Sequence, residues 1–338
     1  MNHPVESLAQ HHWVKIICGA SYHDLPTIRN LCLTYALAGA DCLDVSIDSA
    51  AVRAAYAGVV AAKNLQPNLH LPLLMVSVAD GADSHFRKAT FTAADCPSTC
   101  FRPCQAVCPT EAIQFQGLPL GVMAPNCYGC GRCVAVCPSQ LITTYGVRPD
   151  PEDSLALVGP MVTALEIHTQ VGNDAAFCEL WQRLRPWLPQ WRVVSISVTD
   201  DPQLESYLRF LAAVLLQDTD AVIWQTDGRS MSGDLGDGTT HAALRLGKKV
   251  LDWHLPVGAV QLAGGTNRVT AAKMRSQGWS SHGIAYGGYA RTLVEPFLKD
   301  CGSGPLEAHP LLLRQAVSIA RDLVDQFKKV HFKSVHSA

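Results

Sequence analysis

The sequence predicts an α/β protein: a (β/α)8 TIM-barrel-like domain with an inserted α+β module that resembles a two-cluster ferredoxin. Eight short β-rich runs alternate with segments whose apolar residues recur at helical spacing, a pattern typical of parallel βα units. No G-x-G-x-x-G follows the first run, although an open dinucleotide-binding sheet, the alternative architecture, usually has one. Finally, eight of the 13 cysteines lie between residues 96 and 137, which marks a separate module.

The first three strands precede the cysteines. We expect them at 13–20, 42–48 and 71–80, where short apolar runs are bounded by turn residues. Helical patterns at 24–39 and 49–65 follow the first two strands. The third strand leads directly into the cysteine-rich segment, so we expect the module to replace the helix that would follow it, on the side of the barrel where active sites lie.

Five further strand–helix units follow the module. We expect their strands at 164–170, 193–199, 221–228, 259–267 and 281–288, and their helices at 174–188, 201–216, 241–249, 268–278 and 289–300. A last helical pattern at 309–330 predicts a packed helix, with a partner-docking helix as the alternative. The predicted organisation is a first barrel part at 1–80, a ferredoxin-like insert at 81–150, a second barrel part at 151–302, and a C-terminal helix and tail at 303–338.

The composition excludes several classes of protein. With 27 basic and 29 acidic side chains the net charge is -2, so no overall basic field is available to attract nucleic acid. No apolar run approaches the roughly 18 residues that a membrane-spanning helix needs, and the first residues lack the pattern of a secretory signal. We therefore expect a cytoplasmic protein, in which thiols stay reduced and 13 cysteines indicate a metal or redox role.

The eight clustered cysteines form two related runs. CYGCGRCVAVCP at 127–138 has the C-x2-C-x2-C-x3-C-P spacing of bacterial ferredoxins that bind [4Fe-4S] clusters. CPSTCFRPCQAVCP at 96–109 is a looser copy with three residues between successive cysteines. Because CQAVCP and CVAVCP differ at a single position, the segment is an internal repeat, which predicts a two-fold arrangement.

The repeat predicts two crossed sets of metal ligands, because in two-cluster ferredoxins the fourth cysteine of each run binds the other cluster. One set is Cys108, Cys127, Cys130 and Cys133, and the other is Cys96, Cys100, Cys104 and Cys137. The alternative is one or two zinc ions, which the spacing disfavours because it is not that of a zinc ribbon. We expect the remaining cysteines to be inert buried thiols: Cys18, Cys32, Cys42, Cys178 and Cys301.

Glycines end the last two predicted strands and mark a candidate anion site. Gly264 and Gly265 follow one strand, and Gly287 and Gly288 follow the next. In barrels of this class the loops after strands seven and eight often bind phosphate through backbone N–H groups. The alternative is that these glycines only permit tight turns.

Polar residues on three strands are candidates for acid–base chemistry. Alternation along the second strand places Asp44, Ser46 and Asp48 on one face, and the fourth strand has a second such set, Glu166, His168 and Gln170. Asp227 ends the sixth strand. If these faces point into the barrel, the groups meet near its mouth. The alternatives are ordinary polar filling and, for Asp48, a cap on the following helix. No motif for a named reaction is present, so no catalytic residue is assigned.

Late segments of the chain resemble a known family. VIWQTDGRSMSGDLGDGTTHAALRLGKKVL at 222–251, VQLAGGTNRVT at 260–270 and GIAYGGYAR at 283–291, together with the unequal cysteine runs, resemble the LdpA family, the light-dependent period proteins of cyanobacteria and their plant relatives. The likeness covers nearly the whole chain. It implies a soluble iron-sulfur protein that senses cellular redox state and passes light information to the circadian clock through clock proteins or other redox-signalling partners. It also implies cluster ligation by the eight cysteines of the two runs.

Two other functional classes remain open at this stage. An iron-sulfur oxidoreductase would bind a flavin or a small phosphorylated, anionic ligand in the barrel, although no motif supports a flavin or phosphate. A passive electron carrier is the third class, and the large barrel argues against it. The sequence favours a redox-sensing or electron-transfer protein over an enzyme.

Overall fold

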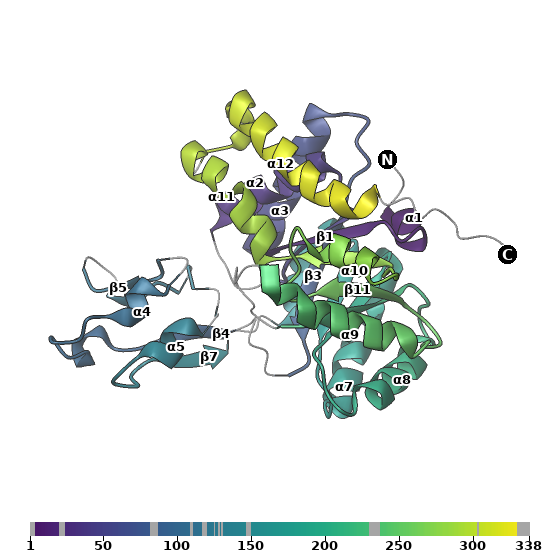
Figure 1. Ribbon diagram of the computed structural model, residues 1–338, viewed down its shortest axis with the longest axis horizontal. Helices are drawn as coiled ribbons and strands as arrows, with labels where there is room; N and C mark the ends of the chain where they lie inside the picture. The colour runs from purple at the N-terminus through teal and green to yellow at the C-terminus, as the bar shows by residue number, and fades with distance from the viewer. Residues whose placement is uncertain are drawn as a thin grey trace.

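The eight predicted strands close into one parallel barrel in the computed structural model of the protein (Figure 1). The structure describes residues 4–19, 24–81, 87–108, 111–116, 120–124, 126–127, 129, 131–146, 150–229, 237–302 and 304–329. The strand order is β1-β12-β11-β10-β9-β8-β3-β2. The bounds are β1 Trp13–Gly19, β2 Cys42–Ser46, β3 Leu73–Ala79, β8 Ala164–His168, β9 Val194–Val198, β10 Val222–Asp227, β11 Ala259–Ala263 and β12 Gly283–Tyr286. The predicted TIM-barrel fold class is therefore confirmed.

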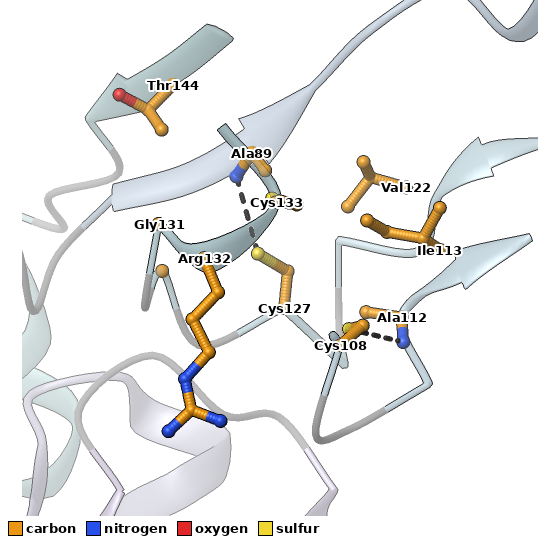
Figure 2. A pocket seen from close by; sticks show the side chains of 11 residues that line it. Ala89, Cys108, Ala112, Ile113, Val122, Cys127, Gly131, Arg132, Cys133 and Thr144 are labelled. Atoms are coloured by element: carbon orange, nitrogen blue, oxygen red, sulfur yellow. Dashed lines mark hydrogen bonds between the residues drawn. The ribbon is translucent and has the colours of Figure 1, made fainter. Parts of the chain in front are cut away.

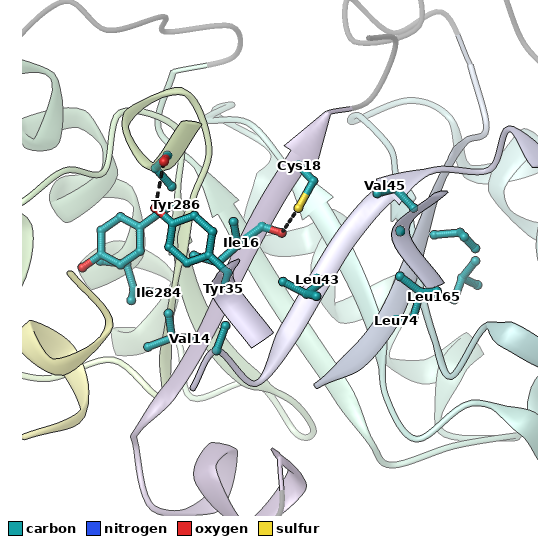
Figure 3. Packing of buried hydrophobic residues seen from close by; sticks show 14 of the residues in the cluster. Val14, Ile16, Cys18, Tyr35, Leu43, Val45, Leu74, Leu165, Ile284 and Tyr286 are labelled. Atoms are coloured by element: carbon teal, nitrogen blue, oxygen red, sulfur yellow. Dashed lines mark hydrogen bonds between the residues drawn. The ribbon is translucent and has the colours of Figure 1, made fainter. Parts of the chain in front are cut away.

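Helices surround the barrel, most of them where the sequence periodicity predicts. They are α2 Leu25–Ala38, α3 Ser49–Leu65, α6 Pro151–Val158, α7 Asp174–Leu184, α8 Leu204–Leu215, α9 Thr240–Asp252, α10 Thr270–Ser276 and α11 Gly288–Cys301. Their apolar faces and the outer faces of the strands form the main core, in which Ile16, Tyr35 and Leu43 are completely buried (Figure 3). This burial, rather than helix propensity alone, holds the outer layer on the sheet.

A helix follows the cysteine-rich module, so the expectation that the module replaces this helix is wrong. α6 is short and packs against α3 and α7. Asp150 caps its N-terminus by accepting hydrogen bonds from the backbone N–H groups of Glu152 and Asp153, and a proline at its first position favours the helical start. The module is therefore an insertion between β3 and α6.

The inserted module contains two small antiparallel sheets and two short helices. β4 Arg87–Thr90 pairs with β7 Thr143–Gly146, and β5 Ile113–Gln114 pairs with β6 Gly121–Val122. The remaining elements are the 3-10 turn η2 Ala93–Asp95, α4 Pro103–Ala106 and α5 Arg132–Val136. The module has its own apolar core, to which cysteine side chains contribute. Figure 1 shows it beside the barrel, with β4 and β7 on the side nearer the barrel.

The two ends of the chain pack against the barrel. α1 Pro4–Ala9, which the sequence did not reveal, places Leu8 against an inner apolar layer at the beginnings of the strands, formed around Trp13, Cys42, Leu73 and Ile223. This layer closes the N-terminal end of the barrel. α12 Pro310–Lys328 lies against α2 and α11, which confirms the predicted packed helix. No helix within the described ranges is long and apolar enough to cross a membrane.

Candidate functional site

Three of the predicted ligands line one cavity in the module. Cys108, Cys127 and Cys133 surround it together with Ala89, Ile113 and Val122 (Figure 2). Cys108 follows α4, and Cys133 lies in the first turn of α5. Gly131 starts that helix with a left-handed φ of 75°, a conformation that a residue with a side chain adopts at a cost. Cys130, the fourth predicted ligand of this set, lies outside the described residues.

Backbone N–H groups point at two of these sulfurs. The N–H of Ala89 in β4 donates to Sγ of Cys127 at 3.3 Å, and the N–H of Ala112 donates to Sγ of Cys108 at 3.2 Å. Hydrogen bonds of this kind to the sulfurs of metal ligands are among the features that tune a bound iron-sulfur cluster. Arg132 also lines the cavity, and its guanidinium group extends away from the sulfur of Cys127 (Figure 2).

The other predicted set is also brought together. The thiol of Cys96 interacts electrostatically with Cys100 and Cys137, and that of Cys104 interacts with Cys137 and Cys96. Burial and then the neighbouring cysteines raise the pKa of Cys96. Burial also raises the pKa of Cys137, but hydrogen bonds from the backbone N–H groups of residues 139–142 outweigh this effect. The pKa of Cys137 is therefore lowered. Cys108 thus shares a cavity with Cys127 and Cys133, and Cys137 has Cys96 and Cys104 as neighbours. Whether these groups bind two clusters stays a prediction.

The geometry of these thiols fits a cluster. Within the described ranges, no three His, Cys, Asp or Glu side chains converge on one point that could hold a single metal ion. Four cysteine thiolates bind a [4Fe-4S] cluster, so their sulfurs lie around the cluster and do not converge on one point. Thiol donors around a largely apolar cavity, with N–H groups aimed at two of the sulfurs, fit such a group.

A second polar site lies on the barrel axis. Lys15 of β1 is completely buried, forms an ion pair with Glu166 of β8, and lies with its Nζ 3.4 Å from Oδ2 of Asp44 in β2. Glu166 also accepts hydrogen bonds from Oγ of Ser195 and Nε2 of Gln225, each at 2.8 Å. These groups lie above the apolar layer around Trp13, so the barrel has an apolar base and a charged middle.

His168 joins this network from the end of β8. Its Nε2 lies 3.0 Å from Oε1 of Glu166, and its side chain is 12% exposed. Burial alone would raise the pKa of Glu166. The Lys15 and His168 side chains outweigh this effect and hold that pKa below its usual range. Burial has the stronger effect on Asp44 and raises its pKa to about 6, despite Lys15. A carboxylate and a histidine in contact near the barrel mouth are suited to proton transfer.

The other polar candidates differ in their placement. Asp48 caps α3, since its side chain accepts hydrogen bonds from the N–H groups of Ala50 and Ala51. Ser46 is buried, and its Oγ has no hydrogen-bond partner among the residues that the structure describes. Gln170 is exposed beyond the end of β8, and Asp227 is the last residue of β10. The sequence missed Lys15, because an isolated lysine in an apolar run carries no sign of partners far away in the chain.

The candidate glycines occupy two kinds of position. Gly264 and Gly265 have left-handed φ angles of 66° and 96°. A Cβ on Gly264 would lie 1.7 Å from Oδ1 of Asp227, so the turn depends on glycine. Gly287 caps α11, and Gly288 is its first residue, as an anion site at a helix N-terminus would require. Gly264 is required by its tight turn, and an anion site at Gly287 and Gly288 stays a prediction.

The five isolated cysteines are not all buried. Cys18, Cys32 and Cys42 are completely buried, whereas Cys178 and Cys301 are partly exposed. The expectation of buried thiols is thus wrong for the last two, because each lies on a helix at the surface of the barrel. Sγ of Cys32 lies 3.6 Å from Sγ of Cys18, a proximity that the sequence did not indicate.

Comparisons with known proteins identify both parts of the chain. The family described as "Light dependent period A C-terminal domain" matches residues 157–326, and the family described as "LdpA Fe-S cluster-binding domain" matches residues 96–148. A curated protein named "Light dependent period A" from Synechococcus elongatus is 48% identical, over 96% of this chain and 94% of that protein.

Solved barrel proteins are similar in shape only. A Mycobacterium tuberculosis tryptophan synthase structure has 13% identity and a TM-score of 0.46, covering 96% of both chains. The YdjI aldolase from Escherichia coli K12 has 9% identity and a TM-score of 0.46, covering 96% of this chain and 95% of the other. The barrel fold here rests on its own closed strand order.

Proposed function

Because the chain belongs to the light dependent period A family and contains its Fe-S cluster-binding domain, we propose that it holds two [4Fe-4S] clusters and acts as a redox sensor. One cluster is held by Cys108, Cys127, Cys130 and Cys133, and the other by Cys96, Cys100, Cys104 and Cys137. When bound, such a group supplies one-electron transfer at a potential set by its surroundings. The observation that supports this proposal is the crossed grouping of the described thiols.

The protein supplies the surroundings that set this potential. The N–H groups of Ala89 and Ala112 and the residues after Cys137 stabilise negative charge on the ligand sulfurs. Apolar side chains such as Ile113 and Val122 restrict water around the first ligand set. Both features are known to tune cluster potentials, so this module is suited to respond to a change in cellular redox state.

The proposed sensor signals from the cytoplasm to proteins of the circadian clock. The family name supports a role in setting the period of the clock in response to light. The module lies between barrel elements, so it is connected to the barrel at both ends. A change of charge in the module can therefore act on the barrel surface. If oxidation and reduction leave partner affinity unchanged, sensing is the wrong function.

Iron and sulfide quantitation with EPR on anaerobically purified protein tests the ligand assignment. Cys133→Ser and Cys100→Ser should each lower the iron and sulfide content by about one cluster. Cys178→Ser is the matched control, because Cys178 lies on α7 of the barrel, and its loss should leave iron content unchanged. Full iron content in both ligand variants would refute the assignment.

A second candidate function is an iron-sulfur oxidoreductase with a ligand in the barrel. The buried network of Lys15, Glu166 and His168 favours this function. Burying charged groups costs stability, and such groups cluster at functional sites. The test is mass spectrometry of small molecules released on denaturation. A flavin or phosphorylated compound in stoichiometric amount would favour this function over sensing alone.

A further inference from the structure

Lys88 places a buried positive charge beside one proposed cluster site. It lies in β4 with a relative exposure of 2%. Its Nζ donates hydrogen bonds to the backbone oxygens of Ala124 and Cys127, the latter at 3.1 Å. The first oxygen belongs to the loop that leads into the C-x2-C-x2-C run, and the second belongs to the first cysteine of that run. An ammonium group in a protein interior is costly unless nearby negative charge compensates it.

The next residue of the same strand contacts the ligand itself. The N–H of Ala89 donates to Sγ of Cys127. β4 therefore directs both a backbone dipole and a full charge at one ligand. The strand is fixed in this position because Lys88 and Ala89 pair with Tyr145 and Thr144 of β7.

The same lysine also interacts with the barrel. Its ammonium group interacts electrostatically with the carboxylate of Asp48, the residue that follows β2 and caps α3. β4 lies on the side of the module nearer the barrel (Figure 1). Lys88 thus contacts a ligand loop of the module and also interacts with the charge of a barrel carboxylate.

We propose that Lys88 raises the reduction potential of the cluster held by Cys108, Cys127, Cys130 and Cys133, and that Asp48 opposes this effect from the barrel. The inference rests on the proposed function. Reduction adds one electron to this site without making or breaking a bond. A fixed positive charge stabilises the added negative charge, whereas a carboxylate destabilises it. The barrel and one cluster are therefore coupled through their charges.

An EPR-monitored titration of the anaerobic, full-length holoprotein with dithionite tests this coupling. Lys88→Gln keeps a hydrogen-bond donor for the loop and removes the charge. We expect it to shift the reduction equilibrium of one cluster about tenfold toward the oxidised state, which is about 59 mV for one electron. The other cluster should keep its potential.

Asp48→Asn should shift the same cluster in the opposite direction, by less than tenfold. Asparagine caps a helix about as well as aspartate, so the fold should be retained. Lys63→Met is the matched control, because Lys63 also donates to a backbone oxygen, that of Leu69, but lies on α3 outside the module. The clusters of the Lys63→Met variant should have the reduction potentials of the wild type.

Iron content separates failure of this inference from failure of the proposed function. Unchanged potentials in Lys88→Gln and Asp48→Asn, with full iron content, would refute the coupling and leave the clusters in place. Wild-type protein without iron and sulfide would refute the proposed function instead. If Lys88→Gln loses iron, Asp48→Asn decides: a raised potential supports the coupling, and an unchanged one refutes it.

Discussion

At the scale of single residues, Asp44 and Glu166 show how one network gives two carboxyl groups different properties. Both are buried, and both lie near Lys15. Glu166 receives hydrogen bonds from Ser195, Gln225 and Lys15, so its charge is compensated. Asp44 accepts a hydrogen bond from the hydroxyl group of Ser77, and its Oδ2 lies 3.4 Å from Nζ of Lys15, farther than Glu166 does. The better-compensated carboxyl remains ionised, and the other one takes up a proton more readily.

This difference predicts a pH-dependent stability. The pKa of Asp44 rises from 3.8 to about 6 on folding, so the folded state binds the proton more tightly. Its stabilising contribution is complete below about pH 4 and is lost as the pH rises through 6. Relative to Asp44→Asn, the wild type should lose about 2 kcal/mol between pH 4 and pH 7. Urea unfolding of both proteins at several pH values measures this loss, and a constant difference would contradict it.

At the scale of elements, the turn after β11 is fixed by the end of β10. Gly264 adopts a left-handed conformation, and a Cβ there would overlap Oδ1 of Asp227 and approach the backbone N of Gly228 and Arg229. The two strand ends are thus packed together at the barrel mouth. Thr266 adds a further link by donating to the backbone oxygen of Ala285 in β12.

We expect Gly264→Ala to destabilise the protein more than Gly172→Ala. Both glycines have positive φ angles, but a Cβ on Gly172 would meet no atom within 4 Å. Both variants therefore share a conformational cost of about 1–2 kcal/mol, and only Gly264→Ala adds about 1–3 kcal/mol of overlap. Thermal unfolding compares the two. Equal losses of stability would show that the turn relaxes without cost.

The regular elements were largely predictable, but their polar contacts were not. The helix at 49–65 was predicted with its observed bounds, because periodic apolar residues follow a capping aspartate. α1 has six residues, too few for a periodic signal. Lys15 and Glu166 are 151 positions apart in the chain, and only closure of the barrel brings them together. The repeat predicts the crossed ligand sets, and this assignment stays a prediction.

At the scale of the whole molecule, the barrel and the module have cores of different kinds. The barrel core contains large side chains such as Trp224 and Phe177. The module core is small, and Cys104, Cys127 and Cys133 belong to it. The core of a domain of this size rarely supplies more than about 3–5 kcal/mol, and metals or disulfides often add to it. The module should therefore depend on its metal far more than the barrel does.

Removal of iron should unfold the module and spare the barrel. After anaerobic treatment with a chelator, we expect proteases to cut between residues 87 and 146, while far-UV circular dichroism retains the barrel signal. Limited proteolysis with mass spectrometry locates the cuts. The holoprotein is the control, and equal cutting of both forms would contradict the prediction.

The insertion point has a consequence for how the chain folds. β3 and β8 are neighbours in the barrel, yet residues 80–163 separate them, so their pairing must close the longest gap between consecutive barrel strands. The entropy lost on closing a flexible loop increases with its length. A module that has already acquired iron would hold its own ends near each other and shorten that loop. Cofactor assembly would then set the rate of barrel closure. Refolding should be faster in the presence of iron and sulfide than in their absence.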